Sequence, residues 1–168
     1  MDARETGNYW ETLINEHGSI LLLYARQWTN SYADAEEIVQ KTFIKLWRSK
    51  RFKKDFPRSY LFKTVRSVAI DSIRSRERRK GREKTYEARE IKPAAMFETK
   101  LESKERRAAI EAEINKLPRE QKEVLVMKIW GDLTFNEIAK TLNVSPNTAA
   151  SRYRYALAAL KRTLNYEQ

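Results

Sequence analysis

One stretch in the last third of this chain constrains its fold most, because it has the residues of two helices joined by a tight turn. Thr134 can cap the first of these helices, and Glu137, three residues later, completes a capping box. Asn143 stands where the turn needs a residue that tolerates positive φ. Ser145 can cap the second helix, and Pro146 fills its first position, where a missing N–H has no cost. The pattern predicts a helix-turn-helix.

The second helix of this motif has one apolar side and one side that faces outward. Helical spacing predicts a buried side made of Ala149, Tyr153, Leu157, Leu160 and Leu164. The outer side carries Asn147, Ala150, Ser151, Arg154 and Tyr155. In a helix-turn-helix protein the start of this helix reaches base edges in DNA. A plain helical hairpin in a bundle is the alternative interpretation.

Positive charge is concentrated in one segment of the 168-residue chain. There are 34 Lys and Arg residues against 23 Asp and Glu, a formal net charge of +11. Residues 45–84 hold 16 basic and 4 acidic side chains, so this segment supplies the whole excess. Such a localised basic stretch suits a polyanion, most simply nucleic acid bound through its phosphates. A membrane surface would also suit it, but no apolar run approaches a transmembrane span and no signal-peptide pattern is present.

The composition argues against an enzyme and against a metal protein. The chain has no cysteine and a single histidine, His17, so it offers neither a thiolate metal site nor a Cys–His pair. Its four glycines are scattered and form no phosphate-binding loop. We therefore expect no catalytic residue, metal, cofactor or small-molecule substrate. The lack of cysteine also fits a reducing cytoplasm.

The amino-terminal part, residues 1–80, is predicted to be one helical unit. A stripe in its first helix joins Leu13, Ile14, His17, Ile20, Leu21, Tyr24, Ala25 and Trp28. Residues 34–47 form its clearest amphipathic helix, with a core face of Ala35, Ile38, Val39, Thr42, Phe43, Leu46 and Trp47. The opposite face carries Glu36, Glu37, Gln40, Lys41, Ile44 and Lys45. Ile44 is an apolar side chain on a polar face, which hints at a partner surface.

A basic helix is predicted from Arg58 to about Lys80. Its inward residues are Leu61, Val65, Val68, Ala69, Ser72 and Ile73, and its outer residues are Lys63, Arg66, Ser67, Ile70, Asp71 and Arg74. Aromatic rings lie among these charges, and single-stranded bases stack on such rings: Phe52, Phe56, Tyr60 and Phe62. We expect Phe62 in the core, whereas the pattern leaves Phe56 open between the core and a base.

The rest of the chain is interpreted as a linker and a second helical unit. Residues 81–104 mix charged residues around Pro93 with little periodicity, which is typical of a flexible linker. Residues 105–168 form the second unit and contain the helix-turn-helix. The predicted fold class is all-α, with two small helical domains joined by a flexible linker.

Three segments in this order resemble bacterial RNA polymerase sigma factors of the sigma-70 family: residues 34–47, 59–74 and 117–125, followed by the helix-turn-helix. The resemblance is greatest to the extracytoplasmic-function group, which keeps only the second and fourth conserved regions. It implies region 2 over 1–80, a linker in the RNA-exit path over 81–104, and region 4 over 105–168.

The resemblance implies a cytoplasmic protein that directs promoter recognition, DNA melting and transcription initiation. Its implied partners are core RNA polymerase, through the β′ clamp helices and the β flap, promoter DNA and an anti-sigma factor, without membrane insertion. The helix at 34–47 would bind polymerase through Glu37, Gln40, Lys41 and Ile44. The −10 element, with one base flipped out, would be bound by Phe52, Phe56, Lys63, Arg66, Ser67, Asp71 and Arg74. The −35 element would be bound by Asn147, Thr148, Ser151, Arg152, Arg154 and Tyr155.

Three positions differ from the family pattern. Family members usually have Asn at the position of Ser67, and basic residues at the positions of Ala150 and Tyr155. The chain therefore reads an unusual promoter sequence, or its second unit binds DNA more weakly.

Two other classes of protein explain part of the pattern. A helix-turn-helix regulator that dimerises on DNA without polymerase accounts for the second unit alone. A basic helical scaffold or RNA-binding protein accounts for the charge alone. Co-elution with core polymerase would favour the sigma factor over both.

Overall fold

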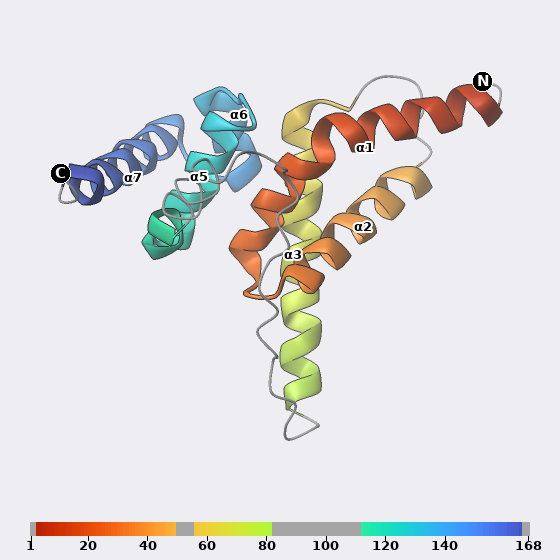
Figure 1. The fold of residues 1–168 in the computed structure, drawn as a ribbon, viewed down its shortest axis with the longest axis horizontal. Helices are drawn as coiled ribbons and strands as arrows, with labels where there is room; N and C mark the ends of the chain where they lie inside the picture. The colour runs from red at the N-terminus through yellow and green to blue at the C-terminus, as the bar shows by residue number, and fades with distance from the viewer. Residues whose placement is uncertain (1–2, 50–55, 82–111, 166–168) are drawn as a thin grey trace, which may run out of the picture. The chain divides into compact units, whose positions relative to one another are not determined.

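The computed structural model describes residues 3–49, 56–81 and 112–165, and the chain divides into two compact units (Figure 1). Unit 1 is Met1–Glu90 and unit 2 is Ile91–Gln168. The described residues are helical apart from short connections, and none of them lies in a strand. The all-α fold class is therefore confirmed. Most of the segment interpreted as a linker lies outside the described residues.

Unit 1 is built from three long helices that each pack against the other two. Helix α1 runs from Ala3 to Ala25 and continues into a short 3-10 helix, η1, over Arg26–Trp28. Helix α2 covers Tyr32–Arg48, and helix α3 covers Arg58–Lys80, as the sequence predicts. The core between them holds fully buried side chains such as Leu21, Tyr24, Leu46, Leu61 and Val65. Each contributes about 1.5–3 kcal/mol by leaving water.

Aromatic packing joins α1 to α3 inside this core. The Tyr24 ring meets the Phe62 ring edge to face, with 5.1 Å between centroids. Phe62 is only 2% exposed, so its expected place in the core is confirmed. His17 is partly buried on α1, and burial, followed by the positive charge of Arg58, lowers its pKa.

Helix α2 begins two residues before the predicted start at 34, at a cap that the sequence analysis did not predict, and most of its core face is confirmed. The Ser31 hydroxyl caps the helix by accepting a hydrogen bond from the Asp34 backbone N–H, at 3.3 Å. Five members of the core face are buried: Ala35, Ile38, Val39, Thr42 and Leu46. Trp47 is 51% exposed, so its prediction as core was wrong. It lies roughly 120° around the helix axis from Ala35, at the edge of the apolar stripe.

Unit 2 contains a helical turn at 112–116 followed by three helices: α5, Arg119–Ile129; α6, Phe135–Leu142; and α7, Pro146–Asn165. Helix α7 packs against both α5 and α6. One part of its core joins Ile114, Leu117, Leu125 and Ala156, with Tyr153, Ala159 and Leu160 packed against them.

The expected helix-turn-helix is present in α6 and α7. The Thr134 hydroxyl accepts from the Glu137 backbone N–H at 3.2 Å, and Glu137 Oε2 accepts from the Thr134 backbone N–H at 2.8 Å. Asn143 has a φ of 56°, in the left-handed region that the turn requires. Ser145 Oγ accepts from the Thr148 backbone N–H at 3.0 Å and so caps α7. Each of these local predictions is confirmed.

Two apolar residues predicted to face the core are exposed. Leu157 on α7 is 39% exposed, while Ala156 is fully buried. Ala156 lies roughly 20° around the helix from Ala149, whereas Leu157 lies roughly 80° away. Ile14 on α1 is 47% exposed although it falls within the stripe. The prediction missed this because helical spacing does not reveal how far the neighbouring helices extend.

The capping box of α6 is expected to stabilise unit 2 measurably. Thr134→Ala should lower its free energy of unfolding by about 1 kcal/mol, because a capping side chain is lost. Hydrogen bonds from the Thr134 backbone and side chain lower the Glu137 pKa below its usual 4.5. The cap is therefore fully effective above that pH, and the effect of Thr134→Ala should shrink as pH falls below it.

Hydrogen exchange of the α6 amides in the full chain measures this effect. Thr12→Ala, at an exposed position of α1, is the control and should leave these amides unchanged. Equal protection in both variants would contradict the assignment of the cap.

Candidate polymerase and nucleic-acid interfaces

The outer face of α2 brings together all four residues predicted to bind polymerase. Glu37 and Lys41 form an ion pair along the helix, with 2.5 Å between Lys41 Nζ and Glu37 Oε1. Gln40 is exposed beside them, and Ile44 is 51% exposed. An exposed ion pair of this kind adds little to the stability of the fold. Its two side chains are therefore not required for folding and can contact a partner.

Trp47 extends this face and was missed as a surface residue. It lies about two helical turns beyond Gln40, so the two side chains share one side of α2. Its indole packs on the Trp10 ring of α1, with centroids 5.4 Å apart and the planes tilted by 33°. Together with Ile44 it makes an apolar patch, and such patches on an exposed face mark partner surfaces. Its angular offset from Ala35 was the signal in the sequence.

The outer face of α3 holds the charged residues predicted to bind the −10 element. Lys63, Asp71 and Arg74 are exposed, and Arg66 and Ser67 are partly buried between them. The Arg66 guanidinium carbon lies 5.5 Å from the centroid of the Trp28 ring, a cation–π contact that holds the side chain against η1. These five residues therefore form one polar face.

Phe56 does not belong to that face. Its ring is 8% exposed, stacks on Tyr60 with 5.7 Å between centroids, and lies 6.2 Å from the Trp10 ring. The ring is part of the core, which answers the alternative that the pattern left open, while a contact of Phe56 with the −10 element stays a prediction. Phe52 lies outside the described residues.

Polar contacts also fix the end of α3 against the start of α2. Arg76 forms an ion pair with Asp34, and Asp34 Oδ2 also accepts from the Thr29 hydroxyl at 3.3 Å. Beyond this contact the last turn of α3 carries Arg78, Arg79 and Lys80, all exposed. Their charges continue the basic surface along the helix.

The start of α7 presents the residues predicted to bind the −35 element. Asn147 and Arg154 are exposed, whereas Thr148, Ser151 and Arg152 are partly buried. Arg154 Nη2 donates to Ser151 Oγ at 3.1 Å, so these two side chains stand together one turn apart. The positive end of the helix dipole also lies here and favours phosphate.

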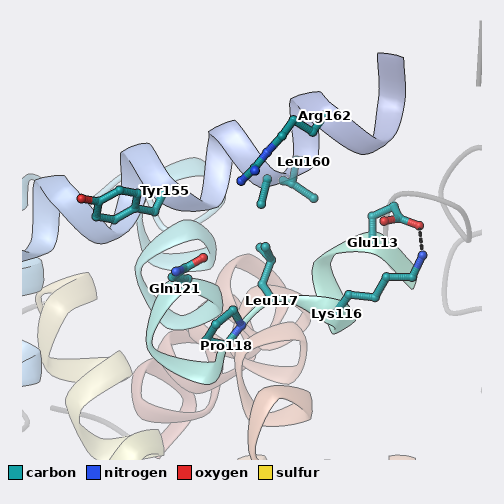
Figure 2. Close-up of a pocket in the computed structure, with 9 residues that line it drawn as sticks. Glu113, Lys116, Leu117, Pro118, Gln121, Tyr155, Leu160 and Arg162 are labelled. Atoms are coloured by element: carbon teal, nitrogen blue, oxygen red, sulfur yellow. Dashed lines mark hydrogen bonds and ion pairs between the residues drawn. The ribbon is translucent and has the colours of Figure 1, made fainter. Parts of the chain in front are cut away.

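Tyr155 is placed differently from these residues. Its ring is 66% exposed and lines an open pocket of about 320 Å³ between α7 and the start of α5. Figure 2 shows Tyr155, Leu160 and Arg162 on the α7 side, opposite Leu117, Pro118 and Gln121. Glu113 and Lys116, joined by an ion pair, complete the rim.

Within the described parts of the chain, no group of acidic or histidine side chains could hold a metal ion. In the same residues no helix has the length and apolar character needed to cross a membrane.

Comparison with known proteins identifies the family. The sigma-70 region 2 family matches residues 13–79, and the sigma-70 region 4 family matches residues 107–160. The ECF RNA polymerase sigma factor SigL of Mycobacterium tuberculosis is 28% identical over 155 residues, which cover 90% of this chain and 86% of SigL. SigK of Mycobacterium ulcerans is 26% identical over 136 residues, 78% of this chain and 72% of SigK. The chain belongs to the sigma-70 family and, within it, to the extracytoplasmic-function group of sigma factors.

Two solved structures have the same fold. The sigma factor RpoE of Bartonella quintana, in complex with the anti-sigma factor NepR, matches with a TM-score of 0.68 at 19% identity, over 96% of this chain and 99% of RpoE. CnrH, in complex with the cytosolic domain of CnrY, matches with a TM-score of 0.63 at 22% identity, over 96% and 91% of the two chains.

Proposed function

We propose that three exposed helix faces divide the work of this sigma factor between them. The protein binds core RNA polymerase, directs it to promoters, and so starts transcription, and we place this activity in the cytoplasm with the polymerase. The observation that supports the division is that the predicted polymerase contacts share the outer face of α2, five of the seven predicted −10 contacts share the outer face of α3, and the predicted −35 contacts lie in the first half of α7. A regulator that acts without polymerase would leave the outer face of α2 without a role.

The outer face of α2 is the proposed contact with the β′ clamp helices of polymerase. Ile44 and Trp47 supply apolar area, and burying such side chains at the centre of an interface gives most of its binding energy. Glu37, Gln40 and Lys41 surround them with polar groups of both charges, which orient a partner helix. The β flap is the proposed second contact, through unit 2.

Gln40→Ala/Ile44→Ala should weaken binding to core polymerase by about tenfold or more, because hot-spot truncations cost over 1 kcal/mol each. The melting temperature should stay the same, since both side chains are exposed. Fluorescence anisotropy of labelled protein with core polymerase measures the affinity.

The matched control for this variant is Glu11→Ala/Asn15→Ala, an exposed pair with the same spacing on α1. It should keep full affinity. If both double variants bind equally well, the outer face of α2 is not the polymerase contact.

The outer face of α3 is the proposed contact with the −10 element in unit 1. Flipping a base out of the stack costs a few kcal/mol, which contacts to the freed strand must offset. Lys63, Arg66 and Arg74 offer charge to the backbone, and Ser67 and Asp71 offer groups that can bond a base edge.

Lys63→Ala and Arg66→Ala should each reduce open complexes by about tenfold or more, the size expected for losing a hydrogen bond from a charged group. Permanganate reactivity of unpaired thymines scores the open complex, and gel shifts at low temperature score closed complexes. Closed-complex binding should change less. Lys161→Ala, which removes an exposed charge at the far end of α7, is the control. Normal melting in both α3 variants would count against this face.

The start of α7 is the proposed contact with the −35 element, through Asn147, Thr148, Ser151, Arg152, Arg154 and Tyr155. Arg154 is the exposed guanidinium on this surface and can pair with guanine through two hydrogen bonds, a discrimination of about 1–3 kcal/mol. The hydrogen bond that Ser151 accepts from Arg154 fixes the direction of the Arg154 side chain on the helix surface. Arg152, partly buried, is assigned to a phosphate.

Arg154→Ala should therefore relax the preference at one or two −35 positions, because a base contact is lost. Arg152→Ala should weaken all promoters alike and flatten the salt dependence. Transcription from a library with a randomised −35 element measures both. The assignment fails if Arg154→Ala lowers every sequence equally while Arg152→Ala changes which sequences are preferred.

An anti-sigma factor is the remaining proposed partner. RpoE, which shares this fold, is in complex with the anti-sigma factor NepR, and CnrH is in complex with the cytosolic domain of CnrY. The apolar patch on α2 would be covered by that partner while polymerase is absent.

A further inference from the structure

One contact links the helix proposed to bind polymerase with the helix proposed to bind the −10 element. Lys45, on the last turn of α2, donates to the Ser67 hydroxyl of α3, with 3.2 Å between Nζ and Oγ. The two residues are 22 positions apart, so the contact exists only because α2 and α3 pack together. Lys45 is exposed and has no role in either proposed interface so far.

This hydrogen bond affects whether the Ser67 hydroxyl donates a hydrogen bond to a DNA base or accepts one from it. A lysine ammonium only donates, whereas a serine hydroxyl has one hydrogen and two lone pairs. Because Lys45 donates to Ser67 Oγ, that oxygen acts as the acceptor of the pair, and its own hydrogen remains to be donated elsewhere. The hydroxyl is thereby polarised, since a hydrogen bond from a charged donor is stronger than one from a neutral donor.

The neighbouring residue on α3 has the same hydrogen-bonding character. Arg66 also only donates, and its guanidinium is held over the Trp28 ring of η1. Both residues therefore offer donors on the outer face of α3, from neighbouring positions of the helix. Base atoms that match donors are carbonyl oxygens and ring nitrogens, such as guanine O6 and N7, while an amino group such as adenine N6 does not match.

We propose that Lys45 is a positioning residue for −10 recognition: by occupying one lone pair of Ser67 Oγ it turns the hydroxyl hydrogen away from the ammonium and toward the DNA, and so favours a base with an acceptor at that position. The proposal rests on the proposed function of the α3 face. In the free protein water competes for both side chains, so the contact adds little to stability. Its effect arises when DNA covers the face and water leaves, because hydrogen bonds strengthen in a less polar surrounding.

The test is transcription by the reconstituted holoenzyme from a promoter library with a randomised −10 element. Lys45→Met removes the donor but keeps the length of the side chain, and Lys45→Arg keeps a donor. Ser67→Ala removes the hydroxyl. Lys45→Met should change the preference at one −10 position by about three- to tenfold, the size of one net hydrogen bond. Bases with an amino group at that position should gain, because both lone pairs of Ser67 Oγ are then free to accept and the hydroxyl hydrogen is no longer turned toward the DNA.

Coupling between the two residues gives the signature that a purely structural role would not produce. Ser67→Ala should affect the same position as Lys45→Met, and the double variant should not differ from Ser67→Ala alone. Lys45→Arg should keep the original preference. Affinity for core polymerase, measured in parallel, should be unchanged in every Lys45 variant.

The proposal is overturned if Lys45→Met has no effect, or if it has either of two other effects. One is a uniform loss across all sequences in Lys45→Met, which would make Lys45 a phosphate contact. The other is a change at a different position from Ser67→Ala. Lys63→Ala and Arg74→Ala distinguish failure of the role of Lys45 from failure of the proposed −10 contact on α3. If those variants and Ser67→Ala leave melting and −10 preference intact, the α3 face does not read the element. If they act and Lys45→Met does not, only the role of Lys45 is wrong.

Discussion

Burial of the inner face of α2 is the constraint on which the rest of unit 1 depends. Ala35 and Thr42 are fully buried, and the Thr42 hydroxyl is satisfied by donating to the Ile38 carbonyl oxygen at 2.8 Å. These two short side chains leave room for α1 and α3 to pack closely against α2. Once this face is buried, helical geometry alone turns Glu37, Gln40, Lys41 and Ile44 to the outside. The hydrophobic core thus sets the orientation of the proposed polymerase contact.

A few polar contacts then join side chains of α2 and α3, whose packing is set by the core. Asp34, at the start of α2, meets Arg76 near the end of α3, and Lys45, at the end of α2, meets Ser67 in the middle of α3. These contacts lie at opposite ends of α2 and fix the directions of the side chains that make them, although such exposed pairs add little to stability. Arg66 is held in a similar way by Trp28. The side chains proposed to contact DNA are therefore arranged by partners on other elements, not by α3 alone.

Sequence reasoning succeeded where the signal is local. The caps at Thr134 and Ser145 and the turn at Asn143 depend on residues within four positions of one another, and all were predicted. The range of α3 was predicted from the helical spacing of its inward residues. The stripes of α2 and α7 were also correct near their centres.

Sequence reasoning failed at the edges of those stripes and for contacts between distant residues. Trp47 and Leu157 lie where a small change of angle decides between core and surface, and neighbouring helices settle that choice. Phe56 could not be assigned, since its burial depends on Trp10 from another helix. The Lys45–Ser67 contact has no local signature. The roles of individual residues in binding polymerase and DNA remain predictions, whereas membership of the family follows from the matches to both regions.

The exposed pair Ile44 and Trp47 has a consequence for the isolated protein. Two large apolar side chains on one surface favour association of identical molecules in water. The net charge of +11 opposes it, because like-charged molecules repel one another. Salt screens that repulsion beyond about 10 Å at 0.1 M, while leaving the apolar attraction in place. The free protein should therefore become more prone to self-association as ionic strength rises.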